Sequence, residues 1–322
     1  MAKIFITRAI PEPALQLLSE AFGAPAIEVY PHDRIIARDE LTAAVVGREA
    51  VLTMLTDPWD AAMFDAAMPS LKVLANCAVG YNNIQVDEAT ARGVTVTNTP
   101  DVLSEATADL AWALIMGASR RVGEAERYLR AGKWDSWSPN FMLGNEIFGK
   151  TLGIYGMGRI GRATARRALG FNMKVIYHSR TQRSAEEEAA LGARYVSFDE
   201  LLEQSDILSI HSPLAPETTG VFGADAFKRM KNTAVLVNTS RGPVVQEAAL
   251  AAALKAGDIA FAGIDVFEKE PEVHAGLLDC ENALLLPHIG SATLETRTAM
   301  ACLAVENIIA VLKGNTPPTP VN

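Results

Sequence analysis

Residues 151–162 have the sequence Thr151-Leu-Gly-Ile-Tyr-Gly-Met-Gly-Arg-Ile-Gly-Arg162. An apolar run comes first, and Gly156, Gly158 and Gly161 then follow at G-x-G-x-x-G spacing. The first glycine permits a tight turn, the second lets a pyrophosphate approach the backbone, and the third lets a helix pack on the strand. A further strand candidate at Lys174–His178 favours a dinucleotide-binding unit over a merely structural strand, turn and helix, with the helix N-terminus facing an anion.

Bulk properties bound the class of protein. The 322 residues are enough for two domains, and 49% apolar with 21% charged residues is ordinary for a globular chain. The net charge of −9 argues against nucleic acid or an anionic membrane as a partner. Three cysteines without a C-x-x-C pair indicate neither a disulfide framework nor a metal site. The N-terminus has no signal-peptide pattern and no apolar run is long enough to span a membrane, so the expected location is cytoplasmic.

Strands alternate with helices before the glycine motif, which predicts a parallel sheet covered on both faces. The strand candidates there are residues 3–7, 27–30, 50–54, 71–76 and 95–98. A long helix is predicted over 102–122 and a second over about 123–131. The loop at 133–149 contains Trp134, Trp137 and Phe141, which we expect to pack under the loop or in a subunit contact rather than to line a substrate site.

The same alternation resumes after residue 150, and polar residues follow several of these strands. The strand candidates are 151–155, 174–178, 207–211, 234–238, 260–265 and 283–286, with a minor one at 194–196. Ligands of open parallel sheets bind outside the carboxyl edge, so the polar residues should meet along one rim. The first domain has its own rim at 54–57 and 76–81, and a cleft between the two rims is the expected site.

The end of the second strand of this domain indicates which cofactor binds. A site selective for NAD would place an Asp or Glu there for the ribose 2′-hydroxyl. The sequence Tyr177-His-Ser-Arg-Thr-Gln-Arg183 contains no carboxylate, whereas Ser179 and Arg180 can hold a 2′-phosphate. We therefore predict a preference for NADP, with NAD possible if Arg180 only stacks on adenine.

Three residue types that suit hydride transfer to a 2-oxo acid follow later strands. Arg241 follows the Asn238-Thr-Ser turn, Glu270 lies in a loop, and His288 stands in Pro287-His-Ile-Gly-Ser291. A cationic fork can bind a carboxylate and polarise a carbonyl, while a histidine can donate the proton. A carboxylate partner stabilises the protonated histidine and fixes its tautomer. On pattern alone, ordinary loop polarity is the favoured interpretation of these three residues.

Five motifs, in order, make the chain resemble the D-isomer-specific 2-hydroxyacid dehydrogenase family, in its glyoxylate/hydroxypyruvate reductase branch. They are Asn76-Cys-Ala-Val-Gly-Tyr-Asn-Asn83, Gly153–Gly161, Val237-Asn-Thr-Ser-Arg-Gly-Pro-Val-Val245, Gly263-Ile-Asp-Val-Phe-Glu-Lys-Glu-Pro271 and Leu286-Pro-His-Ile-Gly-Ser-Ala-Thr293. The resemblance implies that Arg241, Glu270 and His288 are catalytic, and the histidine separates the chain from the formate dehydrogenase branch, which has glutamine there.

The resemblance also assigns binding residues. It places Leu55, Val79 and Gly80 at the substrate, together with Arg241 and His288, and the N–H groups of Val79 and Gly80 on its carboxylate. The cofactor contacts that it implies are Gly156, Gly158, Arg159, Ile160, Gly161, Ser179, Arg180, His211, Pro213, Thr239, Asp265, His288 and Gly290. The aspartate that many NAD-dependent members have at Ser179 is missing here.

The family fold implies an α/β protein with two doubly wound parallel-sheet domains, a Rossmann nucleotide domain inserted in a flavodoxin-like substrate domain. The substrate domain would comprise 1–101 plus 290–322 and the nucleotide domain 102–289. The implied activity is NADPH-dependent reduction of glyoxylate and hydroxypyruvate to D-2-hydroxy acids by a homodimer. The alternatives are a D-lactate or bulkier 2-keto acid dehydrogenase of the same family and, more remotely, a non-catalytic nucleotide-sensing binding protein.

Overall fold

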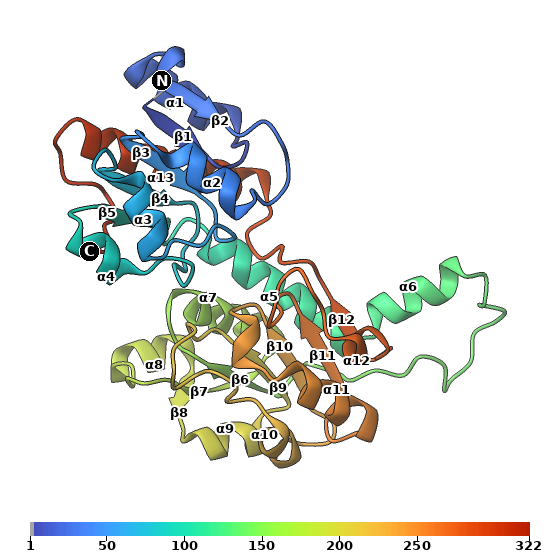
Figure 1. Ribbon diagram of the computed structural model, residues 1–322. Coiled ribbons are helices and arrows are strands. Elements are labelled where there is room, and N and C mark those ends of the chain that lie inside the picture. The colour runs from blue at the N-terminus through green and yellow to red at the C-terminus, as the bar shows by residue number, and fades with distance from the viewer. Residues whose placement is uncertain (1–2) are drawn as a thin grey trace. The chain divides into compact units, whose positions relative to one another are not determined.

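The chain folds into two compact units, which a computed structural model describes over residues 3–322 (Figure 1). One unit runs to Leu103 and resumes at Ser291–Asn322, and the other comprises Ser104–Gly290. The second unit is therefore inserted in the sequence of the first. Each unit is built on a single parallel sheet, as the alternation of strands and helices predicts.

The first unit has a five-stranded sheet in the order β2-β1-β3-β4-β5, and all its pairings are parallel. This is the flavodoxin-like order that the resemblance implies. The strands are β1 Ile4–Ile6, β2 Ile27–Val29, β3 Ala50–Thr53, β4 Val73–Asn76 and β5 Thr95–Thr97. The helices are α1 Glu12–Phe22, α2 Arg38–Val45, α3 Ala61–Ala67, α4 Val86–Ala91 and α13 Leu294–Leu312, with the short helix η1 at Ala24–Ala26.

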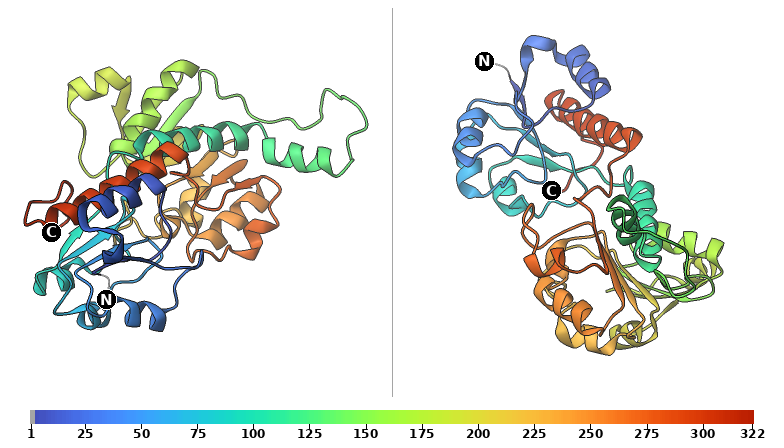
Figure 2. Two further views of the ribbon diagram at one scale, coloured as in Figure 1. Left: turned by 90° about the horizontal axis from the view of Figure 1, so that it is seen from above. Right: turned by 90° about the vertical axis from the view of Figure 1, so that its right-hand side faces the viewer.

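The C-terminal helix α13 completes this unit by packing beside α1, near the start of the chain (Figure 2). Its buried residues join a core cluster that includes Ile4 and Leu18. The tail then returns to the sheet, because Val321 donates its N–H to Val96 at 2.8 Å. The two ends of the chain therefore share one core, although the inserted unit separates them in sequence.

The inserted unit has a seven-stranded sheet in the order β12-β11-β10-β9-β6-β7-β8, again wholly parallel. The strands are β6 Thr151–Tyr155, β7 Lys174–His178, β8 Ala193–Tyr195, β9 Ile207–Ile210, β10 Val235–Asn238, β11 Phe261–Ile264 and β12 Ala283–Leu285. Counted from the β8 edge, six strands lie in the order β8-β7-β6-β9-β10-β11, which is the Rossmann order. The chain changes direction across the sheet between β6 and β9. The glycine motif begins at that switch point.

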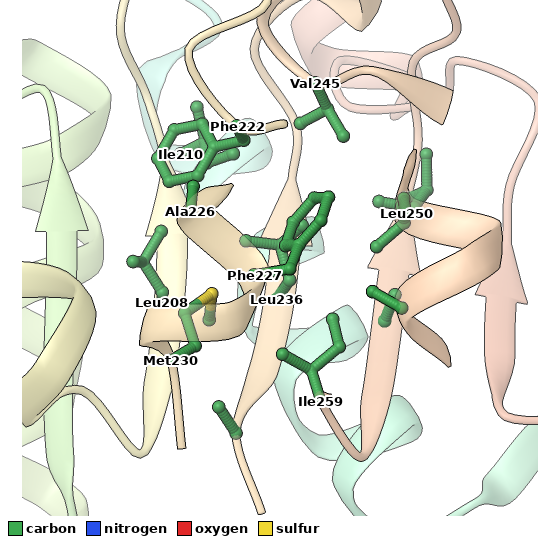
Figure 3. Close-up of a cluster of buried hydrophobic side chains, with 14 of the residues drawn as sticks. Leu208, Ile210, Phe222, Ala226, Phe227, Met230, Leu236, Val245, Leu250 and Ile259 are labelled. Carbon is green, nitrogen blue, oxygen red and sulfur yellow. The ribbon is translucent and has the colours of Figure 1, made fainter. Parts of the chain in front are cut away.

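Helices cover both faces of this sheet (Figure 1). They are α5 Ser104–Ser119, α6 Val122–Arg130, α7 Arg159–Ala168, α8 Ala185–Leu191, α9 Phe198–Gln204, α10 Ala224–Arg229, α11 Glu247–Ala256 and α12 Ala275–Leu278, with short turns η2 Leu169–Phe171 and η3 Gly242–Val244. On one face, side chains from α10 and α11 meet strand residues in a continuous apolar cluster (Figure 3). Phe227 and Leu236 in this cluster are fully buried.

Short local signals explain where several of these helices begin. Ser184 accepts the N–H of Glu187, whose side chain bonds back to Ser184, and Ser197 forms the same capping box with Glu200. The predicted single helix over 102–122 is wrong at its end, because α5 stops at Ser119. Arg121 takes a left-handed conformation with φ 54°, and a new helix starts at Val122.

The segment after α5 extends away from the sheet of its own unit (Figure 1). It consists of α6 and an irregular loop that reaches Lys150. Trp134 and Trp137 there are 55% and 79% exposed, so they do not pack under the loop. The other expected place for them, a subunit contact, stays a prediction. Phe141 does contact a ring of its own segment, that of Tyr128, at 5.3 Å between centroids.

Among residues 3–322, no helix is both long and apolar enough to cross a membrane. The same residues contain no group of three or more His, Cys, Asp or Glu side chains arranged to hold a metal ion.

Candidate active site

The glycine turn after β6 has the backbone that its spacing predicts. Gly156 has φ 99°, and a Cβ there would lie 2.6 Å from the N of Ser212. A Cβ on Gly161 would lie 2.2 Å from the carbonyl oxygen of Gly156, so α7 packs directly on the turn. Gly158, by contrast, faces open space, with nothing within 4 Å of an added Cβ. The turn thus leaves room for a ligand at the middle glycine only.

The first turn of α7 completes this cradle. Arg159 and Ile160 are the first two residues of the helix. The first helical hydrogen bond runs from the N–H of Arg162 to the carbonyl of Gly158. The N–H groups ahead of that point face the helix end, where the helix dipole favours an anion. Together with the space at Gly158, this geometry suits a pyrophosphate.

This contrast between glycines gives a testable prediction. We expect Gly158→Ala to fold with an unchanged Tm but to raise the KM for the nicotinamide cofactor about tenfold or more, because its methyl group fills the space for the pyrophosphate. Gly161→Ala should lower the Tm as well, because its Cβ collides with backbone. Thermal melts and cofactor titrations of both variants distinguish the two effects; equal Tm losses would contradict the assignment of open space to Gly158.

The end of β7 presents Ser179 and Arg180 near the same turn. The Arg180 side chain is 91% exposed and its Nη1 lies 3.9 Å from Oε1 of Glu217, an exposed ion pair that contributes little stability. The Ser179 hydroxyl donates to the carbonyl of Thr181 at 2.7 Å. Arg180 is therefore available to an anion at the rim, whereas Ser179 would have to turn its hydroxyl to donate to one.

Several buried polar atoms on the adjoining strand ends have no partner among the described residues. They are Nδ1 of His211, Oγ of Ser212 and Oγ1 of Thr239. The other ring nitrogen of His211 lies 2.8 Å from Oγ of Ser209, and burial lowers the pKa of His211 to about 3, so the ring is neutral. Pro213, two residues after His211, is exposed. Unpaired buried polar atoms are costly, which is consistent with a polar ligand at this edge.

The turn after β10 fixes Arg241. Asn238, which is fully buried, donates from Nδ2 to the carbonyl of Arg241 at 3.0 Å and accepts the N–H of Ser240 at 3.0 Å. Nη1 of Arg241 donates to the carbonyl of Ser240 at 2.7 Å. Burial lowers the pKa of Arg241 and the charge of Glu270 opposes that effect; a guanidinium stays protonated at any physiological pH. The remaining donors can bind an anion.

His288 and Glu270 form a hydrogen-bonded pair. Nδ1 of His288 lies 2.7 Å from Oε2 of Glu270, and each side chain is 28% exposed. The other carboxylate oxygen of Glu270 accepts the N–H of Phe267 at 3.1 Å. Burial raises the pKa of Glu270, but the hydrogen bond and charge of His288, together with the N–H of Phe267 and the charge of Arg241, hold that pKa below its ordinary value. With Nδ1 bonded to a carboxylate, Nε2 is the nitrogen that remains for a substrate.

The backbone of His288 is held in an unusual conformation by Asp265. His288 has φ 54°, a left-handed value that is rare for a side chain other than glycine or asparagine. Its N–H donates to the carbonyl of Asp265 at 2.9 Å, while the Asp265 carboxylate accepts the N–H groups of Ile289 at 2.7 Å and Gly290 at 2.9 Å. Both carboxylate oxygens of Asp265 are therefore engaged with the histidine loop, although the resemblance assigns this residue to the cofactor.

Sequence reasoning did not identify Glu247, which supports the loop of Glu270. This glutamate is 4% exposed, and its carboxylate accepts the N–H groups of Glu268 and, at 2.8 Å, of His274. The carboxylate of Glu268 in turn accepts the N–H of Glu247 at 3.2 Å. The start of α11 is thus tied to both ends of the segment that carries Glu270. In the sequence Glu247 is simply a glutamate in the first turn of a helix, a common position for an acidic residue.

In the first unit, a second buried carboxylate shapes the loop that carries Leu55. Asp57 is 3% exposed, and one of its oxygens accepts hydrogen bonds from Thr7 at 2.6 Å, Thr53 at 2.9 Å and the N–H of Met54 at 2.9 Å. Leu55 stands half-buried between the residues so fixed. Val79 and Gly80, the other predicted substrate contacts, lie in the loop that follows β4 of the same sheet.

The structure thus brings together, within the inserted unit, the glycine turn, the orphaned polar atoms and the His288–Glu270 pair with the nearby Arg241. Leu55, Val79 and Gly80 belong to the other unit. The space at Gly158, the N-terminus of α7 and the unpaired oxygens of Ser212 and Thr239 fit a nicotinamide dinucleotide.

Comparison with known proteins agrees with this geometry. The family model for the D-isomer specific 2-hydroxyacid dehydrogenase, NAD binding domain, matches residues 112–290. A glyoxylate reductase from Thermococcus kodakarensis is 48% identical to the chain, over 99% of this chain and 96% of that protein.

Two solved structures extend the comparison to the fold. A protein from Thermus thermophilus superimposes with a TM-score of 0.92 at 41% identity, covering 99% of both chains. An NADPH-dependent glyoxylate/hydroxypyruvate reductase from Sinorhizobium meliloti, solved with NADP and malonate, superimposes with a TM-score of 0.84 at 35% identity, covering 99% of this chain and 96% of that one. The chain therefore belongs to the D-isomer specific 2-hydroxyacid dehydrogenase family, in its glyoxylate reductase branch, and is an NAD(P)-dependent oxidoreductase.

Proposed function

We propose that the chain reduces small 2-oxo acids, glyoxylate and hydroxypyruvate, to D-2-hydroxy acids with NADPH. The observation that carries the proposal is the hydrogen bond of 2.7 Å between His288 and Glu270, because a paired histidine is the group that a carbonyl reduction needs as acid. The names of the relatives support the substrate class: one is a glyoxylate reductase and another a glyoxylate/hydroxypyruvate reductase.

In the proposed mechanism the protein binds, orients and protonates. When bound, the dihydronicotinamide supplies the hydride for the carbonyl carbon. Arg241 binds the substrate carboxylate and polarises the carbonyl, and the N–H groups of Val79 and Gly80 bind the same carboxylate. His288, charged and paired through Nδ1 with Glu270, donates the proton from Nε2 to the oxygen as negative charge develops there. Leu55 contacts the rest of the substrate.

The residues proposed to hold the dinucleotide lie along the carboxyl edge of the second sheet. They are Gly156, Gly158, Arg159, Ile160 and Gly161 at the pyrophosphate, Ser179 and Arg180 at the 2′-phosphate, and His211, Pro213, Thr239, Asp265, His288 and Gly290 toward the nicotinamide. The open space at Gly158 and the unpaired Thr239 oxygen support this assignment.

We expect kcat/KM to be about tenfold or more higher with NADPH than with NADH, because an arginine–phosphate hydrogen bond is charge-assisted. Arg180→Ala should abolish this preference by raising the KM for NADPH alone. Arg194→Ala is the matched control, since it removes another arginine of the same sheet, one whose Nη2 bonds Gln204 at 3.0 Å. A wild-type kcat/KM for NADH equal to or above that for NADPH would refute the NADP assignment.

The substrate assignment is tested by following NADPH oxidation with a panel of glyoxylate, hydroxypyruvate, pyruvate and phenylpyruvate. The highest kcat/KM should belong to one of the first two. A higher value for pyruvate or phenylpyruvate would favour a D-lactate or bulkier 2-keto acid dehydrogenase. Cofactor binding without turnover of any 2-oxo acid would favour a nucleotide-sensing protein.

A homodimer is also part of the proposal. The extended segment with α6 exposes Val122, Leu129, Trp134, Trp137, Leu143 and Phe148, each more than half exposed. Isolated exposed apolar residues are ordinary, but a run of them on one segment is typical of an association surface. Sedimentation of the purified chain tests this point. The cytoplasmic location expected from the sequence stays a prediction.

A further inference from the structure

Three consecutive carbonyl groups in the loop after β4 are all bonded to the protein. The pairs are Ala78 O with the N–H of Thr99 at 2.9 Å, Val79 O with Nδ2 of Asn98 at 2.8 Å, and Gly80 O with Nδ2 of Asn76 at 2.9 Å. Two of the three donors are side-chain amides from the ends of the neighbouring strands β4 and β5. The loop is therefore oriented by groups outside it.

This anchoring determines where the N–H groups of the loop point. In a trans peptide the C=O and N–H bonds are antiparallel across a rigid plane. The carbonyls of residues 78–80 are held by the protein, so the N–H groups of Val79, Gly80 and Tyr81 point the opposite way. Among residues 3–322, none of these three N–H groups donates a hydrogen bond. Successive N–H groups presented in this manner form a concave site for an anion.

The Asn76 side chain, one of these donors, lowers the stability of the fold. The residue is fully buried, and its Oδ1 has no hydrogen-bond partner in the described part of the chain. A buried, unpaired amide oxygen destabilises the fold, so packing alone would favour an apolar side chain here. Among residues 3–322, the bond from Nδ2 to Gly80 is the hydrogen bond that the amide side chain of Asn76 makes.

We propose that Asn76 and Asn98 are positioning residues for the reaction. Their amides hold the carbonyls of Gly80 and Val79, so that the N–H groups of residues 79–81 stand ready to bind the substrate carboxylate. The N–H of Tyr81 is a third donor in this row. The inference rests on the proposed function, which supplies the carboxylate, and it adds the residues that preorganise the site for it.

Asn98 is the better residue for a test, because its backbone is fixed independently of its side chain. Its N–H donates to Thr319 O at 3.3 Å, and its carbonyl accepts the Thr319 hydroxyl at 2.6 Å. Replacing the half-buried side chain therefore leaves the strand end in place. Asn98→Leu and Asn98→Asp have nearly the same shape as asparagine, and neither can donate to Val79.

Both Asn98 variants should raise the KM for glyoxylate and the inhibition constant of oxamate about tenfold, the loss expected for one oriented hydrogen-bonding group. The kcat should fall less, and the Kd for NADPH should not change, because the glycine turn is untouched. Asn282→Leu is the matched control. It removes an amide that belongs to the inserted unit and bonds the carbonyls of Leu254 at 3.3 Å and Ala260 at 2.9 Å.

Unchanged KM and oxamate inhibition in both Asn98 variants, with normal folding, would overturn the inference. So would an equal change in the Asn282→Leu control. Calorimetric titration of oxamate into the NADPH-loaded protein keeps the inference separate from the proposed function. If the wild type binds oxamate but reduces no 2-oxo acid, the proposed function is wrong, and weaker oxamate binding by Asn98→Leu would still support the positioning role. No oxamate binding by the wild type would overturn both.

Discussion

Replacing Arg241 with alanine is expected to lower kcat/KM for glyoxylate by about 10³-fold, since even one donor aimed at developing charge contributes about 10²–10³-fold in an enzyme site. Arg241 is the cation that the turn after β10 presents, and Asn238 fixes that turn by bonds to residues 240 and 241. The backbone should therefore survive the substitution. The measurement is steady-state NADPH oxidation by purified variants with matched thermal melts.

Arg241→Lys is the control for charge without the planar fork. A lysine cannot bind a carboxylate through two parallel N–H groups, so it should recover only part of the lost kcat/KM. Full recovery would show that charge alone is needed. A value for Arg241→Ala close to that of the wild type would remove Arg241 from the mechanism.

His288→Ala is expected to lower kcat by about 10²–10⁴-fold, the usual contribution of a positioned general acid. The protein should still bind NADPH, with a Kd that changes far less than kcat, because His288 is only one of the proposed cofactor contacts and the pyrophosphate cradle does not involve it. His274→Ala is the matched control, since the His274 side chain lies outside the pair and its Nδ1 accepts the N–H of Gly276 at 3.1 Å. Unimpaired turnover by His288→Ala would refute the role of His288 as acid.

Glu270→Gln tests the same pair through pH. The low pKa of Glu270 keeps its carboxylate ionised at neutral pH, and this anion stabilises the protonated imidazole. Without this anion opposite the imidazole, the alkaline limb of the pH profile of kcat/KM should move to lower pH. Because the pKa of Glu270 is lowered in the folded protein, its charge adds to the free energy of unfolding above the ordinary pKa of a glutamate. That contribution is lost as the pH falls through the lowered pKa of Glu270. An unmoved profile would contradict the pairing.

The sequence predicts the nucleotide-binding turn closely because its determinants are local. The predicted strands at 151–155 and 174–178 match β6 and β7 residue for residue, and Gly156 has the positive φ that its place in the motif requires. Apolar runs bounded by turns specify such strands without reference to distant residues. The parallel class of both sheets follows from the same alternation.

The end of α5 could not be predicted in this way, because tertiary contacts determine it. Arg121 continues the helical pattern, yet its side chain bonds both oxygens of Glu124 and the carbonyl of Leu143 and takes a left-handed backbone. Leu143 lies 22 residues further along the chain. Helix propensity carries no information about such a contact.

The supporting residues of the site are a second class that the sequence does not reveal. Glu247, Asp57 and Asn98 are polar residues that each bond backbone groups of a loop that is distant in sequence or tightly turned. The resemblance assigns Asp265 to the cofactor, but its carboxylate bonds Ile289 and Gly290 in the histidine loop. Motifs indicate which residues react, whereas only the structure shows which residues hold them in place.

The most direct test of the central claim is the reduction of hydroxypyruvate by the wild-type chain with NADPH, with the product resolved by chirality. We expect NADPH to be consumed in equal amount to the glycerate formed, and this glycerate to be the D isomer. No consumption of NADPH, or formation of the L isomer, would contradict it.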